Sequence, residues 1–469
     1  MRKRIQVVIT AICAVIMLSL IAYLILHILH GASGNYPEAI SIENASQIYE
    51  AAVINTREYS DLDLQIKDIH HITANGHVYS KEIEQFITYK DMHSQQMTAS
   101  VEEIQTIGNH SVNVFEVYSN NTIYLDIESS CFRTPSDADT FRNRYAPAIP
   151  LHAELYGEIT GLDTGSSYII VFKSPFKAES WIGKDTVNLS ETWAVAHVSR
   201  SGELEKSVYY VSYKEDGITI RRAITVALDY SASAFDIPED TLEYTPISYI
   251  DGPKELEISC GYLLSAKNIS AQTNDTIFFE AYGDKRLQQI NIQATIDNSL
   301  TARVDTNRTL ENTSHTGEIS THKQTQIFEN NTYSISENGG DFKEDDTVTS
   351  DHMRSYYQNL LVSTIMLPQY ISDANESISS GIKTITFSID SVFADQMISN
   401  ACQTLYQKPD LMDTLESSHK LIKLTAYIKL NAVTGIPLSS GIMYSGTHNI
   451  NNFDYLLAYT IDQTYKIPG

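Results

Sequence analysis

A repeated pattern with a period of about 210 residues divides this chain of 469 residues into two halves. Four short matches keep the same order in both: Tyr49–Asn55 with Tyr262–Asn268, Asn120–Tyr124 with Asn330–Tyr333, Phe141–Tyr145 with Met353–Tyr357, and Ile170–Phe172 with Ile385–Phe387. The alternative is chance similarity between two β-rich halves. The shared order and near-constant offset favour a duplication, so we expect similar domains at 41–234 and 257–469, joined by a linker at 235–256.

Each predicted domain begins with a short amphipathic helix, continues as alternating strands, and has a second helix before a closing group of strands. In the first helix Ala45, Tyr49 and Ala52 recur at helical spacing. The second helix is predicted at 138–145 and again at 352–365. We therefore expect an α+β fold class, in which each domain is a curved antiparallel β-sheet wrapping short helices.

The first thirty residues predict a membrane anchor. Residues 5–29 are almost wholly apolar, and a helix needs about 20 such residues to cross a bilayer. Arg2, Lys3 and Arg4 precede this segment and predict its orientation, because basic residues stay on the cytoplasmic side. We expect a cytoplasmic tail at 1–4, a transmembrane signal-anchor helix at 5–29, a juxtamembrane linker at 30–40, and a single-pass protein of the cell membrane with both domains extracytoplasmic. Cleavage as a signal peptide is the alternative.

The composition limits the choice of partners. The chain has 33 Lys and Arg against 58 Asp and Glu, a net charge of −25, and an acidic surface repels nucleic-acid backbones. Cys131, Cys260 and Cys402 allow one disulfide at most, and the sequence leaves their pairing open. We expect no nucleic-acid partner.

No catalytic or metal-binding motif stands out. The densest histidine group is His70, His71 and His77 with Asp68. Neighbouring strand residues point to opposite faces, so His70 and His71 could not readily share one metal ion. The pattern Ser-x-x-Lys at Ser174 lacks the other motifs of penicillin-recognising enzymes. We therefore predict no catalytic residue, no metal site and no cofactor.

The order of helix, strands, helix and closing strands resembles the half-barrel of the lipoprotein-carrier family and related envelope lipid-binding lipoproteins. The local match is Leu424–Leu438, which looks like the family's strand–turn–strand of type Y-I-D-x-x-T-G-L-P. Elsewhere the resemblance is topological. It implies a curved sheet around an apolar space, and it transfers no functional residue. A spanning anchor and a tandem copy are departures from most of the family.

These observations predict a non-catalytic extracytoplasmic protein that binds a lipophilic or cell-envelope ligand. The alternative is a structural or protein-interaction module of an envelope assembly, and an envelope-polymer-processing enzyme is less favoured. Its partners would be the membrane, through the N-terminal helix, and a lipid or an envelope protein. In the second half the predicted ligand-lining residues are Leu360, Leu361, Ile365 and Leu367, opposite Tyr455, Leu457, Tyr459 and Ile461, which recur at period 2 on the closing strand.

Overall fold

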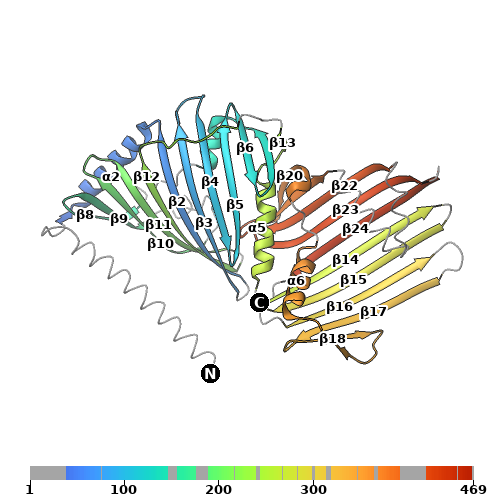
Figure 1. Cartoon of the computed structure of the whole chain (residues 1–469). Coiled ribbons are helices and arrows are strands. Elements are labelled where there is room, and N and C mark those ends of the chain that lie inside the picture. Colours follow the sequence, from blue (N-terminus) through green and yellow to red (C-terminus); the bar gives the residue numbers. More distant parts are fainter. Residues whose placement is uncertain are drawn as a thin grey trace, which may run out of the picture.

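The chain folds around two large β-sheets, one in each half (Figure 1). The computed structural model describes residues 38–74, 77–145, 156–175, 188–215, 217–238, 243–266, 268–281, 284–297, 301–312, 318–345, 347–363, 368–390, 419–450 and 453–466. Within these ranges one sheet has 13 strands and the other has 11.

The first sheet has the strand order β1-β8-β9-β10-β11-β12-β2-β3-β4-β5-β6-β7-β13. All neighbours are antiparallel except β7 and β13, which pair in parallel. The bounds are β1 Glu38–Ile40, β2 Leu62–Ala74, β3 His77–Lys90, β4 Thr98–Ile107, β5 His110–Ser119, β6 Thr122–Ile127, β7 Ser130–Pro135, β8 Tyr156–Asp163, β9 Ser167–Pro175, β10 Asn188–Ser199, β11 Leu204–Glu215, β12 Ile218–Asp229 and β13 Thr245–Pro246.

The second sheet has the order β19-β18-β17-β16-β15-β14-β24-β23-β22-β21-β20. Its strands are β14 Asn268–Ala281, β15 Asp284–Asp297, β16 Ala302–Asn312, β17 Glu318–Glu329, β18 Thr332–Glu337, β19 Lys343–Glu344, β20 Ile371–Ser379, β21 Ile382–Ile389, β22 His419–Asn431, β23 Pro437–Ile450 and β24 Phe453–Lys466. Without β1 and β13, the two sheets have the same strand order. Strands β8–β12 then correspond to β20–β24, and β2–β7 correspond to β14–β19.

One hairpin shows how closely the halves correspond. The β5–β6 turn places Asn120 and Asn121 at φ 51° and 59°, and the β17–β18 turn places Asn330 and Asn331 at 52° and 61°. Asn tolerates the left-handed conformation better than most residues, and tight hairpins of this type require it at both central positions. The Asn-Asn-Thr pattern therefore recurs because both turns need two successive residues in the left-handed conformation. The domain boundaries themselves stay predictions.

Four α-helices occur in the described part: α2 Ile42–Glu58, α3 Ala138–Arg144, α5 Gly252–Ser265 and α6 Ser350–Leu361. Ser41, Asp137 and Thr349 begin three of them, each accepting a hydrogen bond from a first-turn backbone N–H. The predicted apolar face of α2 is confirmed, because Ala45, Tyr49 and Ala52 are buried. Helix α5 begins inside the range predicted as linker.

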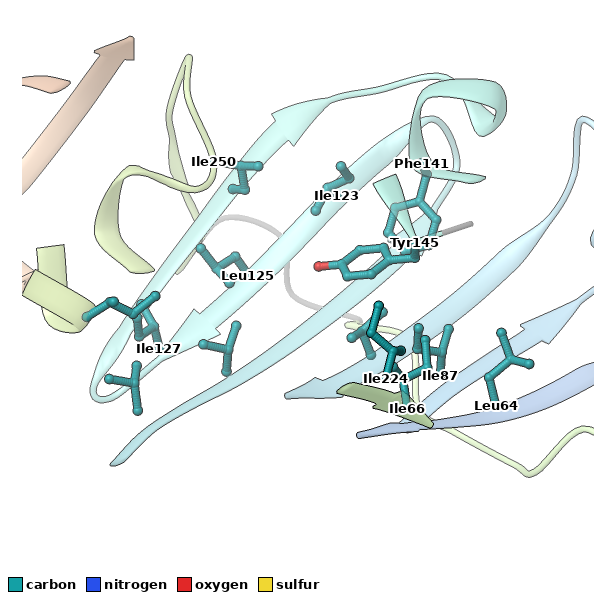
Figure 2. Packing of buried hydrophobic residues seen from close by; sticks show 14 of the residues in the cluster. Leu64, Ile66, Ile87, Ile123, Leu125, Ile127, Phe141, Tyr145, Ile224 and Ile250 are labelled. Atoms are coloured by element: carbon teal, nitrogen blue, oxygen red, sulfur yellow. The ribbon is translucent and has the colours of Figure 1, made fainter. Parts of the chain in front are cut away.

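A single hydrophobic core cluster contains residues of both halves. Helix α5 lies between the two sheets (Figure 1), packing on β4 and β5 of the first sheet and on β20 and β23 of the second. Figure 2 shows the first-half part of this cluster, where Tyr145 lies between Leu125 and the group formed by Ile66, Ile87 and Ile224. The packing of one half therefore depends on the other.

The predicted fold class, α+β with an N-terminal transmembrane helix, is wrong. Strands of up to 14 residues make up most of the described part, and its helices are short additions, so the fold is mainly β. Helical periodicity is easy to recognise in a sequence, and the prediction gave it too much weight.

The predicted single-pass membrane localisation also requires correction. None of the helices in the described ranges is both long and apolar enough to cross a membrane. The predicted anchor at residues 5–29 and its flanking Arg2, Lys3 and Arg4 lie outside the described residues. Residues 38–40, expected in a juxtamembrane linker, form strand β1.

We expect Phe387→Ala, a truncation in β21 of the second half, to lower the unfolding midpoint of both halves together. Phe387 is buried in the shared cluster, and deleting such a side chain costs about 3–5 kcal/mol. Both tryptophans, Trp181 and Trp193, belong to the first half, so their fluorescence reports on that half alone. Urea unfolding should give coincident shifts in tryptophan fluorescence and far-UV circular dichroism. A fluorescence transition that does not move would show that the halves unfold independently.

Candidate functional site

The first candidate is a group of buried charges where α5 meets the first sheet. Lys254, in the first turn of α5, places Nζ 3.3 Å from Oε1 of Glu103 and 3.8 Å from Oε1 of Glu116. Both carboxylates are on the inner face of β4 and β5, and their residues are 3% and 0% exposed. Buried charges of this kind are stable only when paired. Lys254 is therefore the counter-charge that allows two glutamates to be buried here.

Two further residues complete this group, which we call the α5 charge cluster: Glu103, Glu116, Arg144, Asp251 and Lys254. Arg144 of α3 donates from Nη2 to Glu116 at 3.0 Å and from Nη1 to Asp251 at 2.7 Å. Burial opposes ionisation of Asp251, but the Lys254 ammonium and the Arg144 guanidinium hold its pKa below the usual value. The cluster joins α3, α5 and the first sheet.

A second ion pair ties the same helix to the other sheet. Lys383 of β21 donates to Oε1 of Glu255 on α5 and, at 2.8 Å, to the hydroxyl of Tyr249. Tyr262, near the end of α5, donates to the Thr434 carbonyl at 3.2 Å. Charges on two sides of α5 thus find partners on different sheets, and we interpret the α5 charge cluster as structural.

The second candidate is a row of basic residues across the middle of the first sheet. Arg222 on β12, His70 on β2 and Lys81 on β3 are direct cross-strand neighbours and share one face. Arg222 donates to Asp68 from Nε at 3.0 Å and from Nη2 at 2.6 Å, and Nε2 of His70 lies 3.0 Å from Asp68 Oδ1. Burial would raise the pKa of Asp68, but His70 and Arg222 lower it to about 2.

Lys81 differs from its neighbours because it forms no ion pair with another residue of the described part. Burial lowers the pKa of its ammonium to about 8, which leaves the group mostly charged at neutral pH. Burial also lowers the pKa of His70 below 6.5. At neutral pH the row therefore carries the charges of Arg222 and Lys81 against the single carboxylate of Asp68.

An apolar and aromatic row lies beside the basic row. Tyr213, Ile220, Ile72 and Tyr79 are successive cross-strand neighbours on β11, β12, β2 and β3, and all four are buried. The Tyr79 residue is 6% exposed, and its hydroxyl has no hydrogen-bond partner among the described residues. We call these two rows together the inner strip.

The inner strip lies between the main packing surfaces of two helices. Helix α2 packs chiefly on β8, β10 and β11, whereas α5 packs on β4 and β5. The strip occupies β12, β2 and β3, with one end at β11. At the Arg222 end it is open to solvent, because this side chain is 37% exposed.

The predicted ligand-lining residues of the second half fall into separate clusters. Leu361 is buried with Leu263, Ile269 and Tyr465, while Leu360 packs against a third cluster. On β24, Leu457 belongs to the main core, Tyr459 is partly buried and packs against it, and Ile461 is half-buried. Gln463 connects α6 to β24 by donating to the Leu360 carbonyl at 2.8 Å. Ile365, Leu367 and the side chain of Tyr455 lie outside the described residues, and the lining role of the whole set stays a prediction.

Sequence reasoning considered Asp68 and His70 only as a weak metal site, and it missed Arg222, Lys81 and Lys254. His71 is exposed, whereas His70 is on the inner face, as strand alternation predicts. Cys131 and Cys260 are free thiols, and Cys402 lies outside the described residues. Arg222 is 154 residues from Asp68 in the chain, so only the register of β12 against β2 brings them together.

No family model and no curated protein matches the chain. Among solved structures, LprF from Mycobacterium bovis is 10% identical and covers 46% of this chain and 92% of its own, with a TM-score of 0.23. A DUF1329 family protein from Desulfovibrio piger is also 10% identical, covering 42% of this chain and 95% of its own, with a TM-score of 0.17. TM-scores this low do not establish a common fold.

We expect Lys254→Met to destabilise the protein by about 3–5 kcal/mol, because the change leaves the buried carboxylates of Glu103 and Glu116 without their ammonium partner. Urea unfolding should measure the loss. Lys206→Met is the matched control, since Lys206 is exposed on β11 and a surface change of this kind costs at most about 0.5 kcal/mol. Equal stabilities for the two variants would contradict a structural role for the α5 charge cluster.

Glu257, also on α5, should make stability depend on pH. Burial, with the nearby Glu128 carboxylate, raises the pKa of Glu257 from 4.5 to about 7. The folded state therefore binds more protons than the unfolded state between these pH values, and stability falls as the pH rises through them. Glu257→Gln should raise the urea midpoint at pH 8 and leave it nearly unchanged at pH 4.5. Glu205→Gln, an exposed control, should change the urea midpoint at neither pH. An equal effect of Glu257→Gln at both pH values would contradict the raised pKa of Glu257.

Proposed function

We propose that this protein is a non-catalytic binding protein whose ligand is lipophilic and lies along the inner strip. The observation that supports this most directly is the row formed by Tyr213, Ile220, Ile72 and Tyr79, which places a continuous apolar surface beside basic groups. Binding sites for small ligands commonly combine apolar and aromatic linings with a few polar groups that fix orientation. The strip has this composition.

The interior charges support binding better than catalysis. In the α5 charge cluster three carboxylates face the two cations Lys254 and Arg144, and these contacts hold a helix in place. Asp68, with its pKa at about 2, remains a carboxylate at neutral pH and is poorly suited to act as a general base. We therefore assign the interior groups to packing and recognition.

A second candidate function is a structural or protein-interaction module. Leu361 and Leu457 pack into buried clusters, and the strip residues Ile72 and Ile220 belong to the same cluster as Leu457, so a filled interior favours this alternative in both halves. The attachment of α5 to both sheets also favours a fixed arrangement of the halves.

The test compares two substitutions on β2. Ile72→Thr alters the inner strip, whereas Ile69→Thr makes the same change on the opposite face of that strand. Using dodecanol as the probe and calorimetry as the readout, we expect the purified full chain to bind. Ile72→Thr should weaken binding about three- to tenfold, since each buried methylene contributes about 0.8 kcal/mol. Ile69→Thr should bind like the unmodified chain.

Circular dichroism must show that both variants remain folded under the binding conditions. Native protein should also yield bound lipid by mass spectrometry after extraction. Failure of the folded protein to bind dodecanol, together with lipid-free preparations, would contradict ligand binding and favour the interaction module. Equal weakening by both substitutions would place the ligand elsewhere.

A further inference from the structure

We propose that the basic row of the inner strip binds the anionic headgroup of an amphiphile, with Lys81 as the principal contact. This inference rests on the proposed function, because it assigns a chemical class to the ligand of the same strip. The headgroup would be a carboxylate or a phosphate attached to an apolar chain. Its chain would lie along the neighbouring row that contains Ile72 and Ile220.

The charge balance of the strip supports an anion. Within the strip two cations, Arg222 and Lys81, face one carboxylate, Asp68, and Arg222 already holds that carboxylate in a two-point contact. Glu103 of β4 and Glu255 of α5 act on Lys81 from outside the strip, but neither forms an ion pair with it. Lys81 has no ion-pair partner in the described part of the chain. Charged groups shielded from water are normally paired, so an ammonium without an ion-pair partner in the described part favours binding of an anion.

A second observation is the orphaned hydroxyl of Tyr79. Tyr79 is two residues from Lys81 on β3, so the two side chains are on the same face of the strand. The ring of Tyr79 is fixed at its edge by Tyr262 of α5, with centroids 5.7 Å apart. Its buried hydroxyl has no described partner. A headgroup oxygen near Lys81 would supply an acceptor for this hydroxyl, as buried polar groups require.

The second half provides an internal comparison. Strand register places Tyr459, Ile277 and Gln288 where the first half has Arg222, His70 and Lys81. Asp275 corresponds to Asp68, and it accepts a hydrogen bond at Oδ2 from the Tyr459 hydroxyl at 3.4 Å. At these three positions the second sheet therefore has no basic residue, and Arg308 of β16 instead donates from Nε to Oε1 of Gln288 at 2.9 Å. Cations at the three positions themselves are not needed to build this type of sheet, which favours a recognition role for Lys81.

Lys81→Gln tests the proposal and introduces the residue type that the second half has at this position. Calorimetry with the full chain would compare dodecanoate, dodecanol and acetate. We expect dodecanoate to bind about tenfold or more tightly than dodecanol, because hydrogen bonds to charged groups contribute about 1.5–3 kcal/mol. In Lys81→Gln the affinity for dodecanoate should fall to nearly that for dodecanol. Lys206→Gln, which removes an exposed charge, should retain the preference.

The outcomes separate this inference from the proposed function. Equal binding of dodecanoate and dodecanol, unaffected by Lys81→Gln, would overturn the headgroup assignment and leave lipophilic binding intact. Failure to bind either chain would overturn both. If acetate binds as tightly as dodecanoate, the strip is a site for free anions, and the assignment of an amphiphile as its ligand would be overturned. As a control, the Lys81→Gln variant should bind dodecanol with unchanged affinity, which would show that its inner strip remains intact.

Discussion

The buried contacts of helix α5 are the interaction on which the rest of this structure depends. An ammonium as well shielded as that of Lys254 is tolerated because carboxylates from two strands and from its own helix surround it. The next residue of the helix, Glu255, pairs with Lys383 of the second sheet. A helix with partners on both sheets cannot shift without leaving a buried charge unpaired. This explains why one hydrophobic cluster extends through both halves.

The two sheets have the same strand order, yet their inner faces differ in chemistry. In the first sheet Asp68 meets a guanidinium, and its pKa is about 2. In the second sheet Asp275 accepts from the Tyr459 hydroxyl, and burial raises its pKa to about 6. The difference follows from two positions: Arg222 in β12 against Tyr459 in β24, and His70 in β2 against Ile277 in β14. Local substitutions on a common strand order are sufficient to give the two inner faces different electrostatics.

Much of the fold could be predicted because its signals are local. Helical spacing identified α2, the strand–turn–strand pattern of Leu424–Leu438 identified the hairpin at Gly435, and the Asn-Asn pairs identified matching segments. The fold class was wrong because periodicity reveals the type of an element but says little about its share of the chain. The candidate site was harder to predict. Arg222, His70 and Lys81 become neighbours only through the pairing of three strands, and that register is set by long-range packing.

A cationic row in an acidic protein has a simple electrostatic explanation. The net charge of −25 belongs largely to solvated side chains, whose field is screened over about 8 Å at physiological ionic strength. On the inner face of the first sheet fewer water molecules and ions intervene, so the local balance of Lys81, Arg222 and Asp68 dominates. The acidic exterior would then disfavour non-specific binding of anions, while the strip would admit one whose apolar chain contributes the remaining free energy. Charge and apolar surface would have to act together, and this combination gives selectivity for an amphiphile over a free anion.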